Sequence, residues 1–383
     1  MVSVCNIIYL KATWNTTSST PVIRTKAVIH MGPHKTGTTS IQFAANLYSK
    51  ELQQDGFDTV CSMDDDNTLT RQFSSCFLPP GTGEARSYPC NDEYLSAGST
   101  IAMIKRNLFV SAEDFAVIGL QKDTEGVKKL SAYLSQWDDV TIVVYYRHYF
   151  SFLGSKYNQR MKNKSIERGH YKTIQDYMLV NQEGDELKYT VALVKRLESE
   201  FDNIVVMNMH DHRSKKGSPA ESFFCHSVSF FEKTCNAIRL KEEKTTAVQA
   251  THHENASVTL HHIHLLAAAV KVGLLSQEKA STKSIQKAVQ NKVESMDTEK
   301  MKMKCLASEI LQDLWQKSLR YRRILFPVSS SSNSTSLKDD EGLTKDEREM
   351  KSEFELAAKS SLCMIDVDDA MLQTEWQAFF KSI

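Results

Sequence analysis

Residues 31–42, MGPHKTGTTSIQ, combine glycines, a lysine and several hydroxyl side chains at the spacing of a phosphate-binding loop. A glycine-rich turn between a strand and a helix exposes backbone N–H groups, and the helix N-terminus adds partial positive charge, so a phosphate binds there readily. In the G-x-x-x-x-G-K-[ST] loop of nucleoside triphosphatases, the lysine directly follows the second glycine and reaches the β and γ phosphates. Here Gly32 and Gly37 keep that spacing, but Thr38 occupies the lysine position and Lys35 precedes Gly37. The pattern favours a nucleotide with a single 5′-phosphate that carries one transferable group.

A second polar pair follows the most hydrophobic run of the chain, VTIVVYYR at residues 140–147. Arg147 ends this run, and Ser155 lies eight residues later in a segment with helical spacing. An arginine supplies a permanently charged, bidentate clamp for a dianionic phosphate, and a serine about two helical turns further on donates a hydroxyl to the same group. An arginine at the end of a buried strand also serves as an ion-pair partner in many proteins, and that alternative stays open.

The two motifs together resemble the cofactor site of sulfotransferases that use 3′-phosphoadenosine 5′-phosphosulfate (PAPS). PHKTGTT is similar to the 5′-phosphosulfate loop of that family, P-K-x-G-T-T, with one residue of slack before the lysine. The resemblance covers about residues 26–240 and implies that Lys35 contacts the bridging oxygen and the 5′-phosphate, whereas Arg147 and Ser155 bind the 3′-phosphate. The cofactor-binding residues that it implies are Gly32, Lys35, Thr36, Gly37, Thr38, Thr39, Arg147 and Ser155.

Two features depart from the family pattern. Tyr149 stands where the family usually has a proline two residues after the arginine. A further family element, the basic R-K-G-x-x-G loop, is matched only loosely by RSKKGSPAESF at 213–223. The preferred interpretation of that segment is a solvated loop that caps the next helix through Ser218 and Pro219.

The resemblance implies transfer of a sulfuryl group from PAPS to an acceptor hydroxyl, which we expect to belong to a carbohydrate. Lys35 would stabilise negative charge on the leaving phosphate. The acceptor must lose a proton, and Glu113, in SAED after the apolar run LFVS, is the favoured general base, as carbohydrate sulfotransferases in this superfamily use a glutamate. His34 is the second candidate for a catalytic role and Asp114 is the reserve. The alternative for Glu113 is a carboxylate that only caps the following turn.

Two other classes of function remain open. A P-loop kinase or nucleoside triphosphatase would need a lysine after Gly37 and an aspartate that ends a hydrophobic strand to hold Mg²⁺, and SAED is the nearest approach to the latter. A catalytically silent binding protein of the same fold would not need Lys35, Arg147 and Ser155, and all three are present.

These motifs must be positioned by alternating strands and helices. Short β-branched runs are expected to form strands at 27–31, 57–62, 108–115, 140–147 and 203–211. Helical spacing is expected from the loop to Asp55-Gly56 and at 123–136, 149–163 and 185–201, with an irregular loop around Cys61, Cys76 and Cys90. This order predicts an α/β fold with a doubly wound, mostly parallel sheet, a P-loop-like phosphate loop and ligands at the carboxyl ends of the strands.

The chain divides into five predicted segments. We expect an N-terminal extension at 1–25, the sulfotransferase-like α/β domain at 26–240, a helical region at 241–328, a Ser-rich linker at 329–342 and a C-terminal helical arm at 343–383. No strand signal is present beyond about residue 245. A charged helix is expected at 343–361.

Composition sets the broad class. The chain has 383 residues, 41% of them hydrophobic, with 47 basic and 47 acidic residues and no net charge. This balance argues against a nucleic-acid partner and against a polybasic membrane surface. No segment approaches the roughly 20 apolar residues of a membrane span. We expect a soluble protein of the cytoplasm or of the Golgi lumen, and no pattern indicates an oligomeric state.

The eight cysteines contain no CxxC pair, which argues against a zinc ribbon and a dithiol site. In an oxidising lumen, Cys76 and Cys90 would be the first pair to form a disulfide, and reduced thiols are the favoured alternative. Sequons at Asn15, Asn163, Asn255 and Asn333 would be glycosylated only in that lumen. No metal is expected. The histidine group of His252, His253, His261, His262 and His264 is interpreted as a polar helix face and not as a zinc site.

Overall fold

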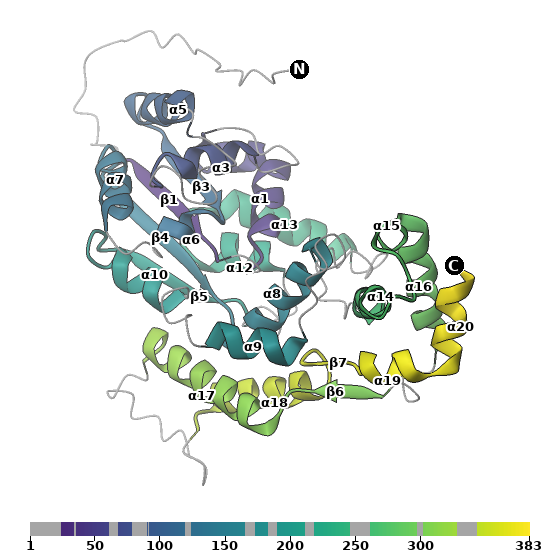
Figure 1. The fold of residues 1–383 in the computed structure, drawn as a ribbon. Coiled ribbons are helices and arrows are strands. Elements are labelled where there is room, and N and C mark those ends of the chain that lie inside the picture. The colour runs from purple at the N-terminus through teal and green to yellow at the C-terminus, as the bar shows by residue number, and fades with distance from the viewer. Residues whose placement is uncertain are drawn as a thin grey trace, which may run out of the picture. The chain divides into compact units, whose positions relative to one another are not determined.

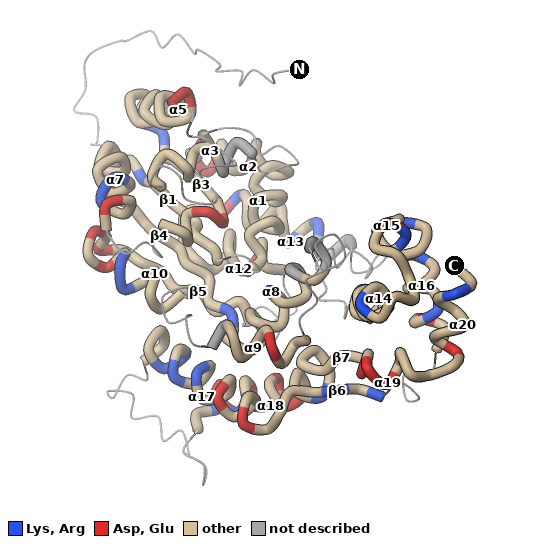
Figure 2. Tube along the Cα trace, viewed as in Figure 1, with Lys and Arg blue, Asp and Glu red and all other residues tan. Residues whose placement is uncertain are grey.

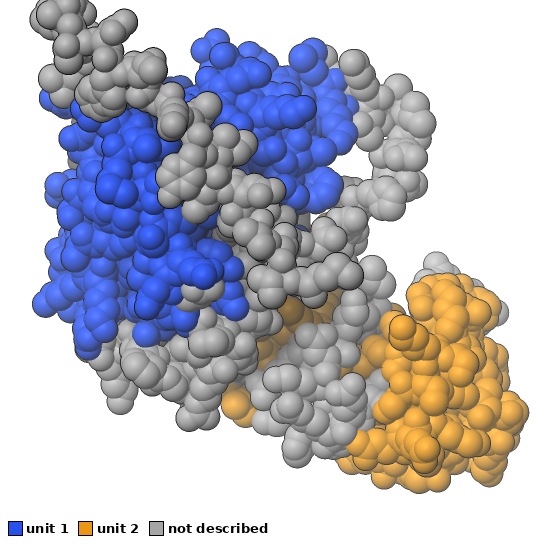
Figure 3. Space-filling view, turned by 90° about the horizontal axis from the view of Figure 1, so that it is seen from above, with its two compact units in different colours: residues 1–147, 186–252 blue, residues 148–185, 253–383 orange. Residues whose placement is uncertain are grey.

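The computed structural model describes residues 24–33, 36–60, 68–78, 90, 92–118, 124–164, 173–182, 190–210, 218–245, 261–296, 302–327 and 343–383. The chain forms two compact units, shown in different colours in Figure 3. Unit 1 comprises residues 1–147 and 186–252, and unit 2 comprises residues 148–185 and 253–383.

Unit 1 is built on a five-stranded parallel sheet (Figure 1). Its strands are β1 (Lys26–Met31), β2 (Phe57–Thr59), β3 (Asn107–Ala112), β4 (Asp139–Tyr146) and β5 (Ile204–Asn208). Their order in the sheet is β2-β3-β1-β4-β5, so β1 is central. The predicted α/β class and its parallel sheet are confirmed, and every predicted strand of this region is present.

The helices of unit 1 cover both faces of the sheet. They are α1 (Thr38–Leu47), α2 (Ser49–Gln54), α3 (Thr68–Ser75), α5 (Asp92–Met103), α6 (Phe115–Ile118), α7 (Glu125–Leu134), α10 (Thr190–Leu197), α12 (Pro219–His226) and α13 (Glu232–Thr245). Helices α1, α2, α12 and α13 share one apolar core with the sheet, whereas Phe73 of α3, Phe115 of α6 and Tyr133 of α7 pack together in a second group. Because both faces are covered, the central strands are buried except at their first one or two residues, which explains their nearly continuous apolar sequences.

Two expectations for unit 1 were wrong in detail. The single helix expected between the loop and Asp55 is divided at Tyr48 into α1 and α2. The irregular loop expected around the first cysteines contains α3, and α5 follows it. Asp92 and Glu93 lie in the first turn of α5, where acidic side chains stabilise a helix through its dipole.

Unit 2 is mostly helical but contains a small sheet. Its elements are α8 (Tyr149–Lys164), α9 (Ile174–Gln182), α14 (His261–Lys271), α15 (Gln277–Ala280), α16 (Lys283–Ser295), β6 (Met303–Cys305), α17 (Ser308–Leu325), α18 (Lys345–Lys359), β7 (Cys363–Ile365), α19 (Val367–Leu372) and α20 (Thr374–Ser382). Strands β6 and β7 pair antiparallel. The expectation that no strand follows residue 245 was therefore wrong, because strands of three residues are too short to show an alternating pattern.

Helices α8 and α9 belong to unit 2, although the predicted α/β domain at 26–240 included them. The backbone N–H of Phe150 donates to Ser318 Oγ at 3.2 Å, and the Phe150 ring meets that of Phe354 edge-on. The Tyr149 ring packs in the same way against Tyr321 on α17. These contacts give Tyr149, which replaces the proline of the sulfotransferase pattern, a structural role in the core of unit 2.

Ion pairs join α17 to α18, the latter being the charged helix expected at 343–361. Basic residues of α17 and acidic residues of α18 are coloured in Figure 2. Arg322 contacts Asp346 at 2.9 Å, and Arg323 contacts Glu347 at 2.7 Å. Burial raises the pKa of Glu347, but hydrogen bonds from Arg323 and from the Thr344 backbone outweigh it and hold that pKa below its ordinary value. The expected linker at 329–342 lies outside the described residues.

Three disulfides connect parts of the fold. Cys76 is bonded to Cys90, Cys225 to Cys235 and Cys305 to Cys363. The first is the pair that the sequence singled out, and the structure has it bridged, against the favoured alternative of reduced thiols. The other two were not anticipated, because sequence spacing does not reveal which cysteines meet in space.

Removing the Cys305–Cys363 bridge should destabilise unit 2 more than removing Cys76–Cys90 destabilises unit 1. A disulfide restricts the unfolded chain more when the loop that it closes is longer, and the sequence separations are 58 and 14. The double variant Cys305→Ser, Cys363→Ser should lose about 4 kcal/mol of unfolding free energy, and Cys76→Ser, Cys90→Ser about 3 kcal/mol. Urea unfolding followed by tryptophan fluorescence measures both. Unfolding of the first variant at the wild-type urea concentration would contradict the bridge.

Candidate functional site

The predicted site residues of unit 1 that the structure describes lie at one edge of the sheet. Because β1, β3 and β4 are parallel and in register, Met31 pairs with Ala112 on one side and Val144 on the other. The residues that follow these strands therefore leave the sheet at the same edge. The chain runs from β1 toward β2 and from β4 toward β5, in opposite directions, and ligands of such sheets bind where this reversal occurs.

Gly37 shapes the loop between β1 and α1. Its φ of 86° is in the left-handed region that favours glycine, and it is the N-cap residue of α1. A Cβ at Gly37 would also lie 2.9 Å from Cβ of Pro219, the first residue of α12. His34 and Lys35, between Pro33 and Thr36, lie outside the described residues, so their predicted roles stay predictions.

Hydroxyl groups crowd the beginning of the loop at Gly32. A Cβ at Gly32 would lie 2.4 Å from Thr38 Oγ1 and 2.7 Å from Thr36 Oγ1, so no other residue fits there without displacing them. Thr36 donates its hydroxyl to the carbonyl of Pro33 at 2.7 Å, and its side chain is buried, as is that of Thr38, whereas Thr39 is exposed. The loop thus brings two of the three predicted threonines back over the end of β1.

The N-terminus of α1 is left available to an anion. No side chain caps it within the part of the chain that the structure describes, and its first turn holds no acidic residue. Backbone N–H groups and the positive end of the helix dipole at such a terminus attract phosphate. The role in phosphate binding that the sequence predicted for this loop stays a prediction.

A buried polar layer supports the loop from below. His30, on β1, is fully buried, and its Nδ1 lies 2.8 Å from Ser111 Oγ on β3. Gln42 of α1 donates from Nε2 to the Ser111 carbonyl at 2.8 Å. The His30 ring meets Tyr145 edge-on at 5.3 Å and Phe223 at 5.2 Å. Burial lowers the pKa of His30 to about 3, so this imidazole is neutral near pH 7.

Sequence reasoning did not identify His30 or Gln42 as part of the site. The signal was present, because His30 is a polar residue within the otherwise apolar run AVIHM, and Gln42 stands on the buried side of α1. A buried polar residue in such a run needs a hydrogen-bond partner. Because His30 lies near the end of its strand, that partner is expected at the same end of a neighbouring strand.

The candidate bases follow β3 directly. Glu113 is half-buried, and Asp114 is buried with 2% of its surface exposed. Their backbone carbonyls accept hydrogen bonds from Ala116 and Val117 at 3.1 and 3.0 Å as α6 begins. The structure places Glu113 at the predicted edge of the sheet; its role as general base stays a prediction.

Arg147 and Ser155 lie in different units. Arg147 directly follows β4 as the last residue of that part of unit 1, and it is half-buried. Ser155 is buried within α8 of unit 2. The strand-end and helix positions that the sequence predicted are confirmed, and the convergence of these two side chains on one phosphate stays a prediction.

The structure describes only part of the segment at 213–223. Residues 213–217 lie outside the described residues. Ser218 is the N-cap of α12, and its Oγ accepts from the Glu221 backbone N–H at 3.0 Å, with Pro219 at the first helical position. The helix cap preferred from the sequence is confirmed. The Tyr145 hydroxyl donates to the Pro219 carbonyl at 3.3 Å, which fixes α12 against β4 beside the loop.

Among the described residues, the histidine group does not form the polar face that was expected. His252 and His253 lie outside the described residues, and His261 and His262 are partly buried. His264 is buried and stacks on Tyr157 at 5.5 Å between ring centroids. Burial lowers the pKa of His264 to about 3, so this residue belongs to the core of unit 2 and stays neutral at pH 7.

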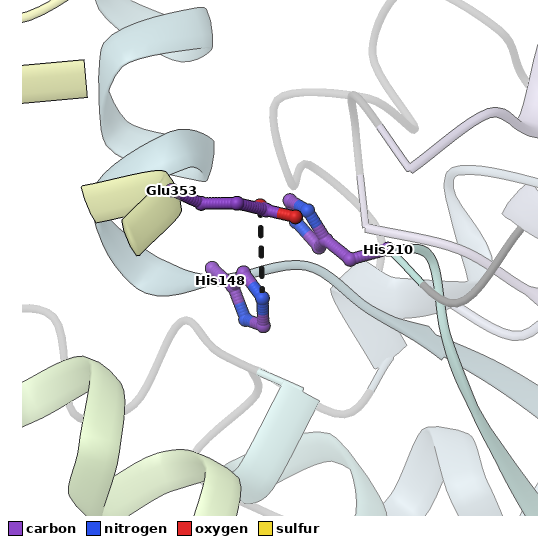
Figure 4. Close-up of side chains that lie close together, drawn as sticks. All are labelled: His148, His210 and Glu353. Carbon is purple, nitrogen blue, oxygen red and sulfur yellow. Dashed lines mark ion pairs between the residues drawn. The ribbon is translucent and has the colours of Figure 1, made fainter. Parts of the chain in front are cut away.

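A further histidine of unit 2 is paired with a carboxylate. His148, at the start of unit 2, is buried, and its Nε2 lies 4.0 Å from Glu353 Oε2 on α18 (Figure 4). His210, drawn in the same figure, belongs to unit 1, where it follows β5 and its backbone N–H donates to Asn208 Oδ1 at 3.2 Å. Neither histidine was among the predicted site residues.

No protein-family model, curated protein or solved structure matches this chain. Among the helices that the structure describes, none has the length and apolar character needed to cross a membrane. The functional assignment therefore depends on the residues of the loop, on their geometry and on the resemblance noted in the sequence.

The buried His30 should make the protein less stable as the pH falls. The pKa of this group is about 3 in the folded chain and 6.5 in the unfolded chain, so between these values the unfolded state binds the proton and the folded state does not. The unfolding free energy should decrease by about 1.4 kcal/mol per pH unit from this residue as the pH falls from 6 toward 3. Urea unfolding of wild type and His30→Gln at pH 7, 5.5 and 4.5 measures the difference in slope.

Ser111→Ala is the matched control for this measurement, because it removes the hydroxyl partner but keeps the buried imidazole. Ser111→Ala should retain the wild-type dependence of the unfolding free energy on pH, whereas His30→Gln should show a shallower dependence. Equal slopes for wild type and His30→Gln would contradict a neutral, buried His30.

Proposed function

We propose that this chain is a PAPS-dependent sulfotransferase that transfers a sulfuryl group to an acceptor hydroxyl of a carbohydrate. The observation that supports this most is the phosphate loop: the hydroxyls of Thr36 and Thr38 fold over Gly32 at the uncapped N-terminus of α1. The threonine at position 38 replaces the lysine that a triphosphate loop requires, and Lys35 supplies the cation from within the loop. Such a loop suits one phosphate with a transferable group better than a triphosphate chain.

In the proposed reaction, the acceptor oxygen attacks the sulfur atom in line with the bond to the 5′-phosphate oxygen. The new S–O bond to the acceptor forms as the S–O bond to the phosphate breaks, and the electron pair of the broken bond stays on the phosphate. Lys35 and the N-terminus of α1 stabilise the charge that develops there. Glu113 accepts the proton of the acceptor hydroxyl, and the products are a sulfate ester and 3′,5′-adenosine bisphosphate.

The placement of the candidate groups agrees with this division of roles. The loop follows β1, Glu113 follows β3 and Arg147 follows β4, and these three strands are neighbours at the centre of the sheet. The cofactor would therefore lie across the ends of β1 and β4, with the acceptor approaching from the β3 side. The polar side chains beneath the loop, His30, Ser111 and Gln42, carry no charge near pH 7. Lys35 is therefore the cation that the loop sequence itself provides.

The disulfides support a place for this reaction. Cys76–Cys90, Cys225–Cys235 and Cys305–Cys363 are stable in oxidising compartments and rare in the cytosol. We infer that the chain works in an oxidising lumen such as that of the Golgi. Carbohydrate acceptors are present in that lumen, and the sequons of this chain would be glycosylated there.

Wild-type protein should bind 3′,5′-adenosine bisphosphate, the desulfated cofactor, in calorimetric titration, and ATP with Mg²⁺ should bind weakly or not at all. Arg147→Ala should weaken this binding by roughly 10- to 100-fold, since it removes a charged hydrogen-bond donor from the 3′-phosphate. Lys35→Ala should lower the rate of sulfuryl transfer by roughly 100- to 1,000-fold. Lys50→Ala, an exposed lysine on α2, is the matched control and should change neither quantity. Binding of ATP alone would assign the chain to the kinases, and binding of neither would favour a silent relative.

Glu113→Gln should lower the transfer rate by roughly 100- to 10,000-fold without changing the affinity for the bisphosphate. The amide cannot accept the acceptor proton, although it has nearly the same shape. Single-turnover transfer to a panel of hydroxylated sugars measures the rate, and titration measures the affinity. Transfer at the wild-type rate would remove Glu113 as the base and make Asp114→Asn the next variant to measure.

A further inference from the structure

Two buried polar atoms lie beside the phosphate loop without hydrogen-bond partners among the described residues. They are Nε2 of His30 and Oγ1 of Thr38. Both side chains are fully buried. Buried polar groups of this kind are rare in folded proteins, and an unpaired one indicates a bound group or a local rearrangement that supplies its partner.

Both side chains approach one point in the loop. A Cβ on Gly32 would lie 2.4 Å from Thr38 Oγ1 and 3.3 Å from His30 Cε1, the ring carbon between Nδ1 and Nε2. Since Gly32 has no side chain, nothing from that residue separates the imidazole edge from the threonine hydroxyl. Thr38 is the first residue of α1, so the pair lies at the N-terminus of that helix, where the anion is expected.

The role of His30 depends on which ring nitrogen carries the proton. Its Nδ1 lies 2.8 Å from the Ser111 hydroxyl, and Ser111 is itself fully buried. In the tautomer that leaves Nε2 protonated, the Ser111 hydroxyl donates its proton to Nδ1. The neutral imidazole then carries its single proton on Nε2, which makes that atom a donor.

We propose that His30 is a positioning residue for the phosphate loop: when a nucleotide phosphate binds, its Nε2–H donates to Thr38 Oγ1. A threonine hydroxyl has one proton and accepts through its lone pairs. Once its oxygen accepts from His30, that proton points away from the imidazole and toward the phosphate oxygen at the helix N-terminus. Ser111, His30 and Thr38 then form a chain of donors that begins on β3 and ends on the ligand.

This inference rests on the proposed function for the identity of the ligand, a nucleotide 5′-phosphate. It assigns His30 a role through Thr38 and no direct contact with the reacting atoms. Loss of His30 should therefore change the affinity for the nucleotide and leave the response to acceptor concentration unchanged. A purely structural role for His30 would instead lower the stability of the protein without coupling to Thr38.

A double-mutant cycle between His30 and Thr38 tests the proposal. His30→Leu and Thr38→Val should each weaken calorimetric binding of 3′,5′-adenosine bisphosphate by about 10-fold, and the double variant should bind no more weakly than either. His30→Gln, whose amide keeps a donor, should recover most of the affinity that His30→Leu loses. Urea unfolding of every variant shows that the compared proteins are folded, and His30→Gln continues the test if His30→Leu does not fold.

The outcomes separate this inference from the proposed function. If wild type binds the bisphosphate but the two substitutions act additively, or His30→Gln is as weak as His30→Leu, the positioning role is overturned and the proposed function stands. If wild type binds ATP with Mg²⁺ instead, and the cycle measured with ATP shows the same coupling, the proposed function is overturned and the positioning role stands. If wild type binds neither nucleotide, both are overturned.

Discussion

The loop folds back over the end of β1 only because residue 32 has no side chain. The hydroxyls of Thr36 and Thr38 occupy the space that a Cβ would take at distances well inside van der Waals contact. Any larger residue would force these two hydroxyls to move. The N–H groups of helix α1, the threonine hydroxyls and the polar residues beneath them all take their positions from this one close approach.

The sheet extends this constraint to the rest of the site. Strands β1, β3 and β4 are buried on both faces, so a shift in register by one residue would move apolar side chains away from their packing partners. Register in turn fixes which residues emerge at the carboxyl edge. The loop, Glu113 and Arg147 occupy neighbouring positions at that edge because hydrophobic packing far below them fixes the alignment of the strands. Chemistry at the edge thus depends on packing in the middle of the sheet.

Local patterns predicted much of this arrangement. The apolar runs identified every strand of the parallel sheet, and the glycines and threonines of residues 31–42 identified the loop, because strand burial and left-handed turns leave direct marks on sequence. Features that depend on contacts between distant segments were missed. The pairing of β6 with β7, the Cys305–Cys363 disulfide and the grouping of α8 with α17 all join residues far apart in the chain. His30 was missed for the same reason, since its partner Ser111 lies on another strand.

Helix α12 borders the loop, and its position depends on a covalent bond far from the loop itself. Its first residue, Pro219, touches Gly37, and Cys225 near its other end is bonded covalently to Cys235 of α13. Pro219 is therefore not free to withdraw from the loop unless α12 turns against a covalent anchor. In a reducing environment α12 would be held by packing, by the Tyr145 hydrogen bond and by the ion pair between Glu221 and Arg239 of α13. Reduction of the Cys225–Cys235 bond would thus remove a covalent restraint on the residue that borders Gly37.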